Sequence, residues 1–240
     1  AQAPGMVVMV DLASNDYASL ARSPAVRARF LEAITTASPS GMGVPRLTDE
    51  ESDAGKPPVL LQGSTGSRLL SGDSSLAHDL EAYLADFHEG EAALLFNSGY
   101  DANVSVLACV PPPGGAILYD ELIHASMHEG IKHSRAATAQ SFKHNDLEDL
   151  TRALRLLQDR GFHHTNNIII AVESVYSMDG HVAPLKGMEA LARAFGAELI
   201  VDEAHGTGVF GTEGRGVCDM MGVKPLVRVH TFGKALGCHG

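Results

Sequence analysis

Lys234 lies in the segment T-F-G-K-A-L-G, close to residue 240 of the sequence. An amine between small residues is typical of a solvated charge, a phosphate ligand or a nucleophile that forms an imine with a carbonyl group. These three functions need different residues elsewhere in the chain. The third also needs a carboxylate and an anion-binding turn.

Polar or glycine residues directly follow several short apolar runs that predict buried strands. These runs are Ala92–Phe96, Ala116–Tyr119, Ile168–Val172, Glu198–Val201 and Leu226–Val229. Ligands of open α/β sheets bind beyond the carboxyl ends of the strands, so residues that follow the runs are candidates for a site. In chain order, the candidates are Ser98, Gly99, Tyr100, His124, Ser177, Asp202, His205, Thr231 and Lys234.

The types of these residues indicate a particular cofactor. Ser98 and Gly99 open a predicted helix, and the backbone N–H groups at a helix start attract phosphate. Asp202 in a closed site would keep an aromatic nitrogen protonated, and Lys234 would supply the amine. A phosphate cradle, a buried carboxylate and a lysine are the groups that a pyridoxal 5'-phosphate (PLP) site requires.

Two histidines extend this prediction. We expect His124 to stack on the cofactor ring and His205 to hydrogen-bond near its phenolic oxygen. Taken singly, each candidate has a simpler explanation: Asp202 is equally typical of a helix cap, and Lys234 of a solvated charge. The joint pattern is what favours a site.

Two other motifs are incomplete. Asp202–His205 spells the D-E-A-H of helicase-type ATPases, but the required upstream G-x-x-x-x-G-K-[ST] is absent. His128 and His133 are five residues apart, about 140° around a helix, and so cannot easily share one metal. His124 and His128 could share a helix face but have no third ligand nearby. We therefore predict no metal site.

Composition excludes several classes of protein. The net charge is −11 and no basic stretch is present, which argues against nucleic-acid binding. No apolar run approaches the roughly 20 residues of a membrane span. Cys109, Cys218 and Cys238 form no C-x-x-C pair and are odd in number, which favours a reducing compartment. We expect a cytoplasmic protein, with an organellar location left open.

Apolar spacing and capping residues predict helices between the strands. They begin at Ser23-Pro24, near Ser75, at Asp146 and near Pro184, and the last three end before Gly90, Gly161 and Gly196. Strands that alternate with helices predict an α/β fold in three layers, with a mostly parallel sheet covered on both faces.

Eight segments together resemble the α-oxoamine synthases, a family of fold-type I PLP-dependent transferases. They run in order from about Asp11 to Gly240: N-D-Y-A-S-L, G-S-T-G-S-R-L-L-S-G, L-L-F-N-S-G-Y-D-A-N, D-E-L-I-H-A-S, H-N-D, E-S-V-Y-S-M-D-G-H-V-A-P-L, V-D-E-A-H-G-T-G-V-F-G-T-E-G-R-G and T-F-G-K-A-L-G. The resemblance is greatest to the 8-amino-7-oxononanoate synthase branch, which serves biotin synthesis.

This resemblance implies a role for each candidate. Lys234 would bind PLP covalently and then remove the α-proton of the amino acid, and Asp202 would pair with the pyridinium nitrogen. The remaining contacts would be His124 on the ring face, His205 and Ser177 near the phenolic oxygen, and Ser98, Gly99, Tyr100 and Thr231 around the phosphate.

The implied reaction joins an amino acid to an acyl-CoA and releases CoA and CO2. L-alanine and pimeloyl-CoA are the substrates of the biotin-pathway branch. Two features leave other branches open, namely the serine palmitoyltransferase, 5-aminolevulinate synthase and ketobutyrate ligase types: Arg68 fits the aminolevulinate pattern better, and residues 48–62 are an acidic insertion. A truncated, non-catalytic homologue is a further alternative.

The resemblance also divides the chain. Residues 1–47 would be an N-terminal arm and helix region, 48–62 an exposed inserted loop, and 63–240 part of the PLP-binding large domain. The family's small C-terminal domain, with an arginine for the substrate carboxylate, is expected beyond residue 240. The chain would then be a fragment truncated after the PLP lysine. We expect the fragment alone to aggregate or stay partly unfolded, and the full-length protein to be a homodimer.

Overall fold

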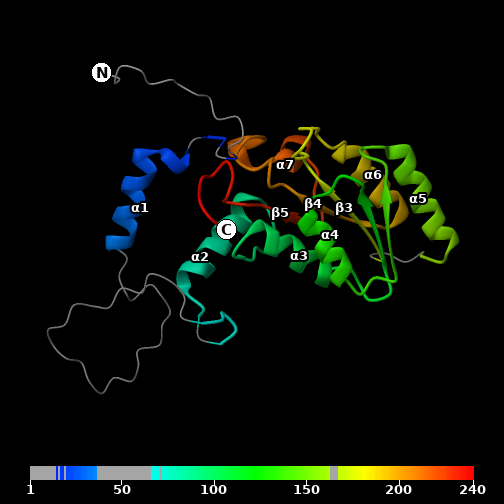
Figure 1. Ribbon diagram of the computed structural model, residues 1–240, viewed down its shortest axis with the longest axis horizontal. Coiled ribbons are helices and arrows are strands. Elements are labelled where there is room, and N and C mark those ends of the chain that lie inside the picture. Colours follow the sequence, from blue (N-terminus) through cyan, green and yellow to red (C-terminus); the bar gives the residue numbers. More distant parts are fainter. Residues whose placement is uncertain (1–14, 16, 19, 37–65, 71, 163–166) are drawn as a thin grey trace, which may run out of the picture. The chain divides into compact units, whose positions relative to one another are not determined.

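The structure is a computed structural model that describes residues 15, 17–18, 20–36, 66–70, 72–162 and 167–240 (Figure 1). The predicted acidic loop, residues 48–62, lies outside these ranges. The chain forms two compact units. One contains Ser98–Gly240 together with the N-terminal residues up to Ala21, and the other contains Arg22–Asn97.

The larger unit is built on a five-stranded sheet in the order β2-β1-β3-β4-β5. The strands are β1 (Ala116–Asp120), β2 (Thr138–Phe142), β3 (Ile168–Glu173), β4 (Glu198–Asp202) and β5 (Val227–Val229). All neighbouring strands are parallel, so their carboxyl ends share one edge of the sheet. The predicted parallel sheet is confirmed.

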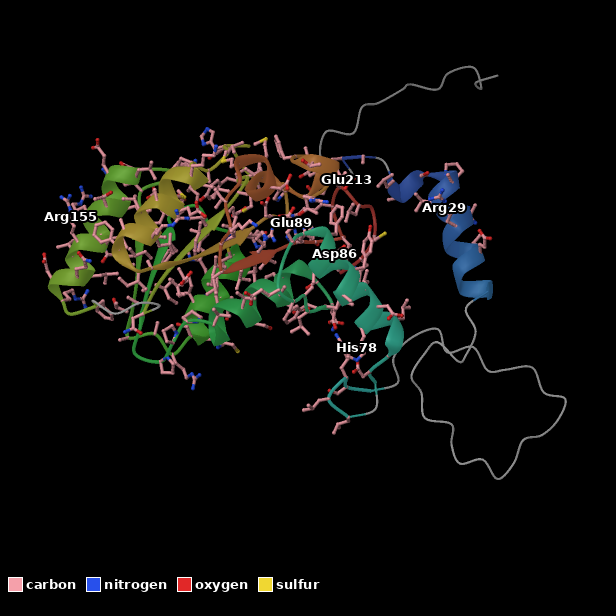
Figure 2. All side chains as sticks on the ribbon, turned by 180° about the vertical axis from the view of Figure 1, so that it is seen from behind. Arg29, His78, Asp86, Glu89, Arg155 and Glu213 are labelled. Atoms are coloured by element: carbon pink, nitrogen blue, oxygen red, sulfur yellow. The ribbon has the colours of Figure 1, made fainter. Side chains whose placement is uncertain are left out.

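Side chains that alternate along each strand cover the two faces of the sheet. On one face, Leu118, Ile170 and Val201 pack against α5 (Leu147–Asp159), α6 (Leu185–Phe195) and α7 (Val217–Met221). On the other, Ile117, Ile169 and Ile200 pack against α3 (Gly99–Cys109) and α4 (Ala125–His133). Side chains fill the space between these layers (Figure 2). The predicted three-layer arrangement is confirmed.

Capping residues explain where two of the covering helices begin and end. Asp146 precedes α5, and its Oδ1 accepts the backbone N–H groups of Glu148 and Asp149, each at 2.9 Å. Helix α6 ends at Gly196, whose φ of 66° is the left-handed conformation that glycine tolerates best. Arg155 lies on the outward side of α5 (Figure 2).

Buried Glu203 joins the end of β4 to the start of α7. Its two carboxylate oxygens accept the N–H groups of Val217 at 3.0 Å and Cys218 at 2.6 Å, and the hydroxyl of Ser174 at 2.7 Å. The short 3-10 helix at Thr212–Gly214 lies in the same connection. The side chain of Glu203 therefore connects the loop after Asp202 both to Ser174 and to the first residues of α7.

The smaller unit contains α1 (Pro24–Thr36), after a 3-10 helix at Leu20–Arg22, and α2 (Ser75–Phe87). The predicted helices are confirmed, although Ser74 rather than Ser75 caps α2, accepting the N–H of Ala77 at 3.2 Å. Leu76, in the first turn of α2, is exposed although it is apolar.

The prediction of a buried strand at Ala92–Phe96 is wrong. These residues form no strand, and Leu94 is 66% exposed. The backbone N–H of Leu95 donates instead to the carboxylate of Glu81 at 2.8 Å, which Arg68 also binds. A side chain thus takes the place of a neighbouring strand.

Candidate active site

Lys234 and His205 are in direct contact. The lysine Nζ lies 2.8 Å from Nε2 of the imidazole. Burial lowers the pKa of Lys234, and nearby Asp202 and Glu173 oppose that effect. Burial, and then the charge of Lys234, lower the pKa of His205 to about 4, so the imidazole is neutral at pH 7.

Asp202 is the last residue of β4 and is 4% exposed. Because side chains alternate along a strand, it faces the same side as Ile200, which is the side covered by α3 and α4. Asn103 of α3 donates to its Oδ2 at 2.6 Å, and the N–H of Ala204 donates to Oδ1 at 2.8 Å. Neutral donors therefore fix both oxygens of a buried carboxylate.

The same asparagine connects Asp202 to His124. Asn103 also donates to the hydroxyl of Ser126 at 3.1 Å, and this hydroxyl lies 2.7 Å from Nδ1 of His124. Nδ1 accepts the N–H of Ser126 as well, which makes His124 the N-cap of α4. The ring of Tyr100 lies edge-on to the imidazole of His124, with 6.4 Å between the two ring centroids. The imidazole is exposed, yet its orientation is set by buried groups.

The start of α3 lies against the residue that follows β5. Ser98 caps the helix and accepts the N–H of Asp101 at 3.0 Å. A Cβ atom on Gly99 would lie 3.2 Å from Cβ of Thr231, so glycine permits this close approach. Thr231 is nearly buried and its hydroxyl accepts the N–H of Gly233, one residue before Lys234.

All of the predicted site residues lie in the larger unit. The charges of Lys234, Asp202 and His124 all act on the pKa of His205, so these side chains lie near it. Ser177 differs, because it is exposed in the turn that Val175 and Val182 close with an antiparallel bridge. Its predicted cofactor contact stays a prediction.

Sequence reasoning missed several residues of this site. Glu173 ends β3 and could have been chosen by the strand-end rule; it is 2% exposed and pairs in register with Asp202. Burial, and then the charge of Asp202, raise the pKa of Glu173 to about 8. Asn103, Ser126 and Tyr17 do not directly follow a predicted strand. They lie within three of the segments that resemble the α-oxoamine synthases, but their residue types alone indicated no contact in the site.

Residues 7–240 match the family described as aminotransferase class I and II. The chain belongs to this family. Its relatives include an 8-amino-7-oxononanoate synthase from Emericella nidulans, 46% identical over 96% of this chain and 54% of the relative. Among solved structures of the family, a serine palmitoyltransferase from S. paucimobilis with a bound PLP–myriocin adduct is 31% identical, with a TM-score of 0.75. The match covers 95% of this chain and 50% of that one.

These comparisons confirm the resemblance to the α-oxoamine synthases and the PLP-dependent transferase fold. A second curated relative, an aminoacyl transferase named sphA from Byssochlamys spectabilis, is 37% identical over 96% of this chain and 47% of the relative. The chain therefore spans about half the length of the aminotransferase class I and II relatives that it matches.

Proposed function

We propose that the complete gene product is a PLP-dependent acyltransferase of the α-oxoamine synthase type. It would condense L-alanine with pimeloyl-CoA and release CoA and CO2, as in biotin synthesis. The observation that carries this proposal is the Lys234–His205 contact at 2.8 Å beside the buried carboxylate of Asp202. The 8-amino-7-oxononanoate synthase relative supports the choice of substrates.

The residues of this edge fit PLP. The carboxylate of Asp202 is buried and receives only neutral donors, so a cationic pyridinium nitrogen would complete its interactions. Gly99 is the first residue of α3 and lies against Thr231, so a phosphate at this helix start would meet backbone N–H groups. The lowered pKa of Lys234 increases the share of unprotonated amine, which is the form that bonds to an aldehyde.

Each residue then has a defined task. PLP, when bound, serves as an electron sink for the α-carbon of the amino acid. Lys234 would hold the cofactor until the amino group of the substrate replaces it, and the freed Nζ, oriented by His205, would then accept the α-proton. His124, held by Ser126, covers the ring. Phosphate contacts come from Ser98, Gly99, Tyr100 and Thr231, and Ser177 is assigned to the phenolic oxygen side.

A second candidate is the condensation of serine with palmitoyl-CoA. The structural likeness to the serine palmitoyltransferase of S. paucimobilis favours it. A non-catalytic homologue is disfavoured because the chain retains the reactive lysine. For the complete protein we also expect a homodimer. The three cysteines are free thiols, which supports a reducing compartment such as the cytoplasm. None of the helices in the described ranges has the length and apolar character that a bilayer crossing demands.

The test is release of CoA by the purified gene product with PLP. Turnover of alanine with pimeloyl-CoA at least tenfold faster than serine with palmitoyl-CoA supports the first candidate, and the reverse ratio supports the second. Lys234→Ala should abolish turnover and the visible absorbance of bound PLP. Lys132→Ala, which changes an exposed lysine paired with Glu129, should leave both unchanged. Turnover that persists in Lys234→Ala would overturn the proposal.

A further inference from the structure

The N-terminal segment supplies a hydrogen bond to the candidate active site. The hydroxyl of Tyr17 lies 2.7 Å from Nδ1 of His205, on the side of the imidazole opposite the contact with Lys234. The same hydroxyl donates to Oδ1 of Asn15 at 3.0 Å. Asn15, Tyr17, His205 and Lys234 thus form one chain of hydrogen bonds.

The number of available protons decides which group donates and which accepts in each of these hydrogen bonds. A tyrosine hydroxyl has a single proton, and here it is donated to Asn15. The oxygen of Tyr17 must then accept from His205, so Nδ1 carries the imidazole proton. A neutral imidazole protonated at Nδ1 has its lone pair at Nε2, which is the atom 2.8 Å from Nζ of Lys234. Nζ therefore donates to Nε2.

The protonation states agree with this direction. Burial raises the pKa of Tyr17, so its hydroxyl keeps the proton that it donates. The pKa of His205, lowered to about 4, keeps the imidazole neutral. With these protonation states, each of the three hydrogen bonds has one donor proton and one acceptor lone pair.

The position of Tyr17 is supported by a second contact of the same segment. Gly237, in the loop that carries Lys234, has a φ of 65° and packs on the backbone of Ala21 and Leu20. Although Tyr17 is 47% exposed, the segment that bears it is therefore packed against the lysine loop four residues from Tyr17.

We propose that Tyr17, held by Asn15, is a positioning residue that fixes His205 in the Nδ1-protonated tautomer and so directs an acceptor lone pair at the amine of Lys234. The inference rests on the proposed function for its catalytic meaning, because Lys234 is the residue that would bind PLP and move the α-proton. The tautomer itself is a property of the protein without cofactor.

The test is nitrogen NMR of the PLP-free gene product with labelled histidine. Nδ1 of His205, assigned through His205→Gln, should show the signal of a protonated ring nitrogen and Nε2 that of an unprotonated one. Tyr17→Phe should shift the signals toward the other tautomer, whereas Asn15→Asp, which keeps an acceptor for the tyrosine hydroxyl, should preserve them. Tyr83→Phe is the matched control, because its hydroxyl-bearing ring is exposed and stacks on Phe87.

The kinetic consequence is a lower kcat for Tyr17→Phe, by about five- to tenfold for the loss of one hydrogen bond, with KM for the amino acid changed less than threefold. If Tyr17→Phe fails to fold by circular dichroism, Asn15→Leu is measured in its place. Unchanged His205 signals in the folded variant overturn the inference. If the signals shift but no acyl-CoA is turned over, the inference holds and the proposed function fails.

Discussion

Glu173 and Asp202 lie side by side at the ends of β3 and β4, paired in register and both almost fully buried. Two adjacent carboxyl groups with little water between them are not both ionised easily. The raised pKa of Glu173, about 8, shows how the site resolves this conflict. Glu173 is therefore protonated at pH 7.

Glu173→Gln should therefore be tolerated in the protein without cofactor. Because the folded pKa of Glu173, about 8, exceeds the ordinary glutamate value of 4.5, its contribution to stability is complete below pH 4.5 and is lost as pH rises through about 8. The parent protein should lose up to about 1.4 kcal/mol of stability per pH unit near neutral pH through this group. Urea unfolding from pH 5 to 8 should show a weaker pH dependence in Glu173→Gln. Equal dependence in the two proteins would contradict the assignment.

Asn103 should control how well Asp202 binds PLP. Asn103→Ala removes a 2.6 Å hydrogen bond to a buried carboxylate and should weaken PLP binding about tenfold, by absorbance titration. Asn103→Asp should weaken it more, because a second negative charge then faces Asp202. The opposite order of the two variants would show that Asn103 acts only through packing.

Glu203 should be required for folding rather than for catalysis. Glu203→Ala leaves the N–H groups of Val217 and Cys218 and the hydroxyl of Ser174 without their buried acceptor. We expect a loss of about 3 to 5 kcal/mol in the free energy of unfolding, measured in urea. Glu129→Ala, which removes a surface ion pair, should change it by less than about 1 kcal/mol.

Gly130 should set the distance between α3 and α4. A Cβ atom at this position would lie 2.8 Å from both Cβ of Leu107 and the carbonyl oxygen of Val104. Gly130→Ala should destabilise the protein by about 1 to 3 kcal/mol, and Gly130→Val by more. Since Asn103 and Ser126 lie on these two helices, PLP affinity should fall in the same order. Melting temperatures that do not differ among the three proteins would refute the close packing.

The elements that could be predicted from the sequence are those in which several consecutive residues are apolar and buried. Strand β3 reads I-I-I-A-V-E and is buried along its whole length, so an apolar run was enough to identify it. Strand β2 reads T-A-Q-S-F, lies at the sheet edge and buries only Phe142, so it gave no such run. Ala92–Phe96 has the composition of a buried strand, but Glu81 binds its backbone instead.

The site residues likewise fall into those that the sequence could locate and those that it could not. Asp202, His205 and Lys234 follow strands, so the general rule for parallel sheets located them. Asn103 contacts Asp202 across 99 positions and Tyr17 contacts His205 across 188. Such pairs depend on how whole helices and segments pack, which no local pattern in a single sequence records.

The packing of Gly237 on Ala21 and Leu20 has a practical consequence for anyone preparing this protein. Trimming residues ahead of α1, a routine step to improve expression, would delete the partner of His205 and the surface on which the lysine loop rests. Such a shortened protein is expected to behave as an active-site mutant although every strand and helix of the sheet layer is intact. Loss of activity after N-terminal truncation would therefore say nothing about targeting or solubility.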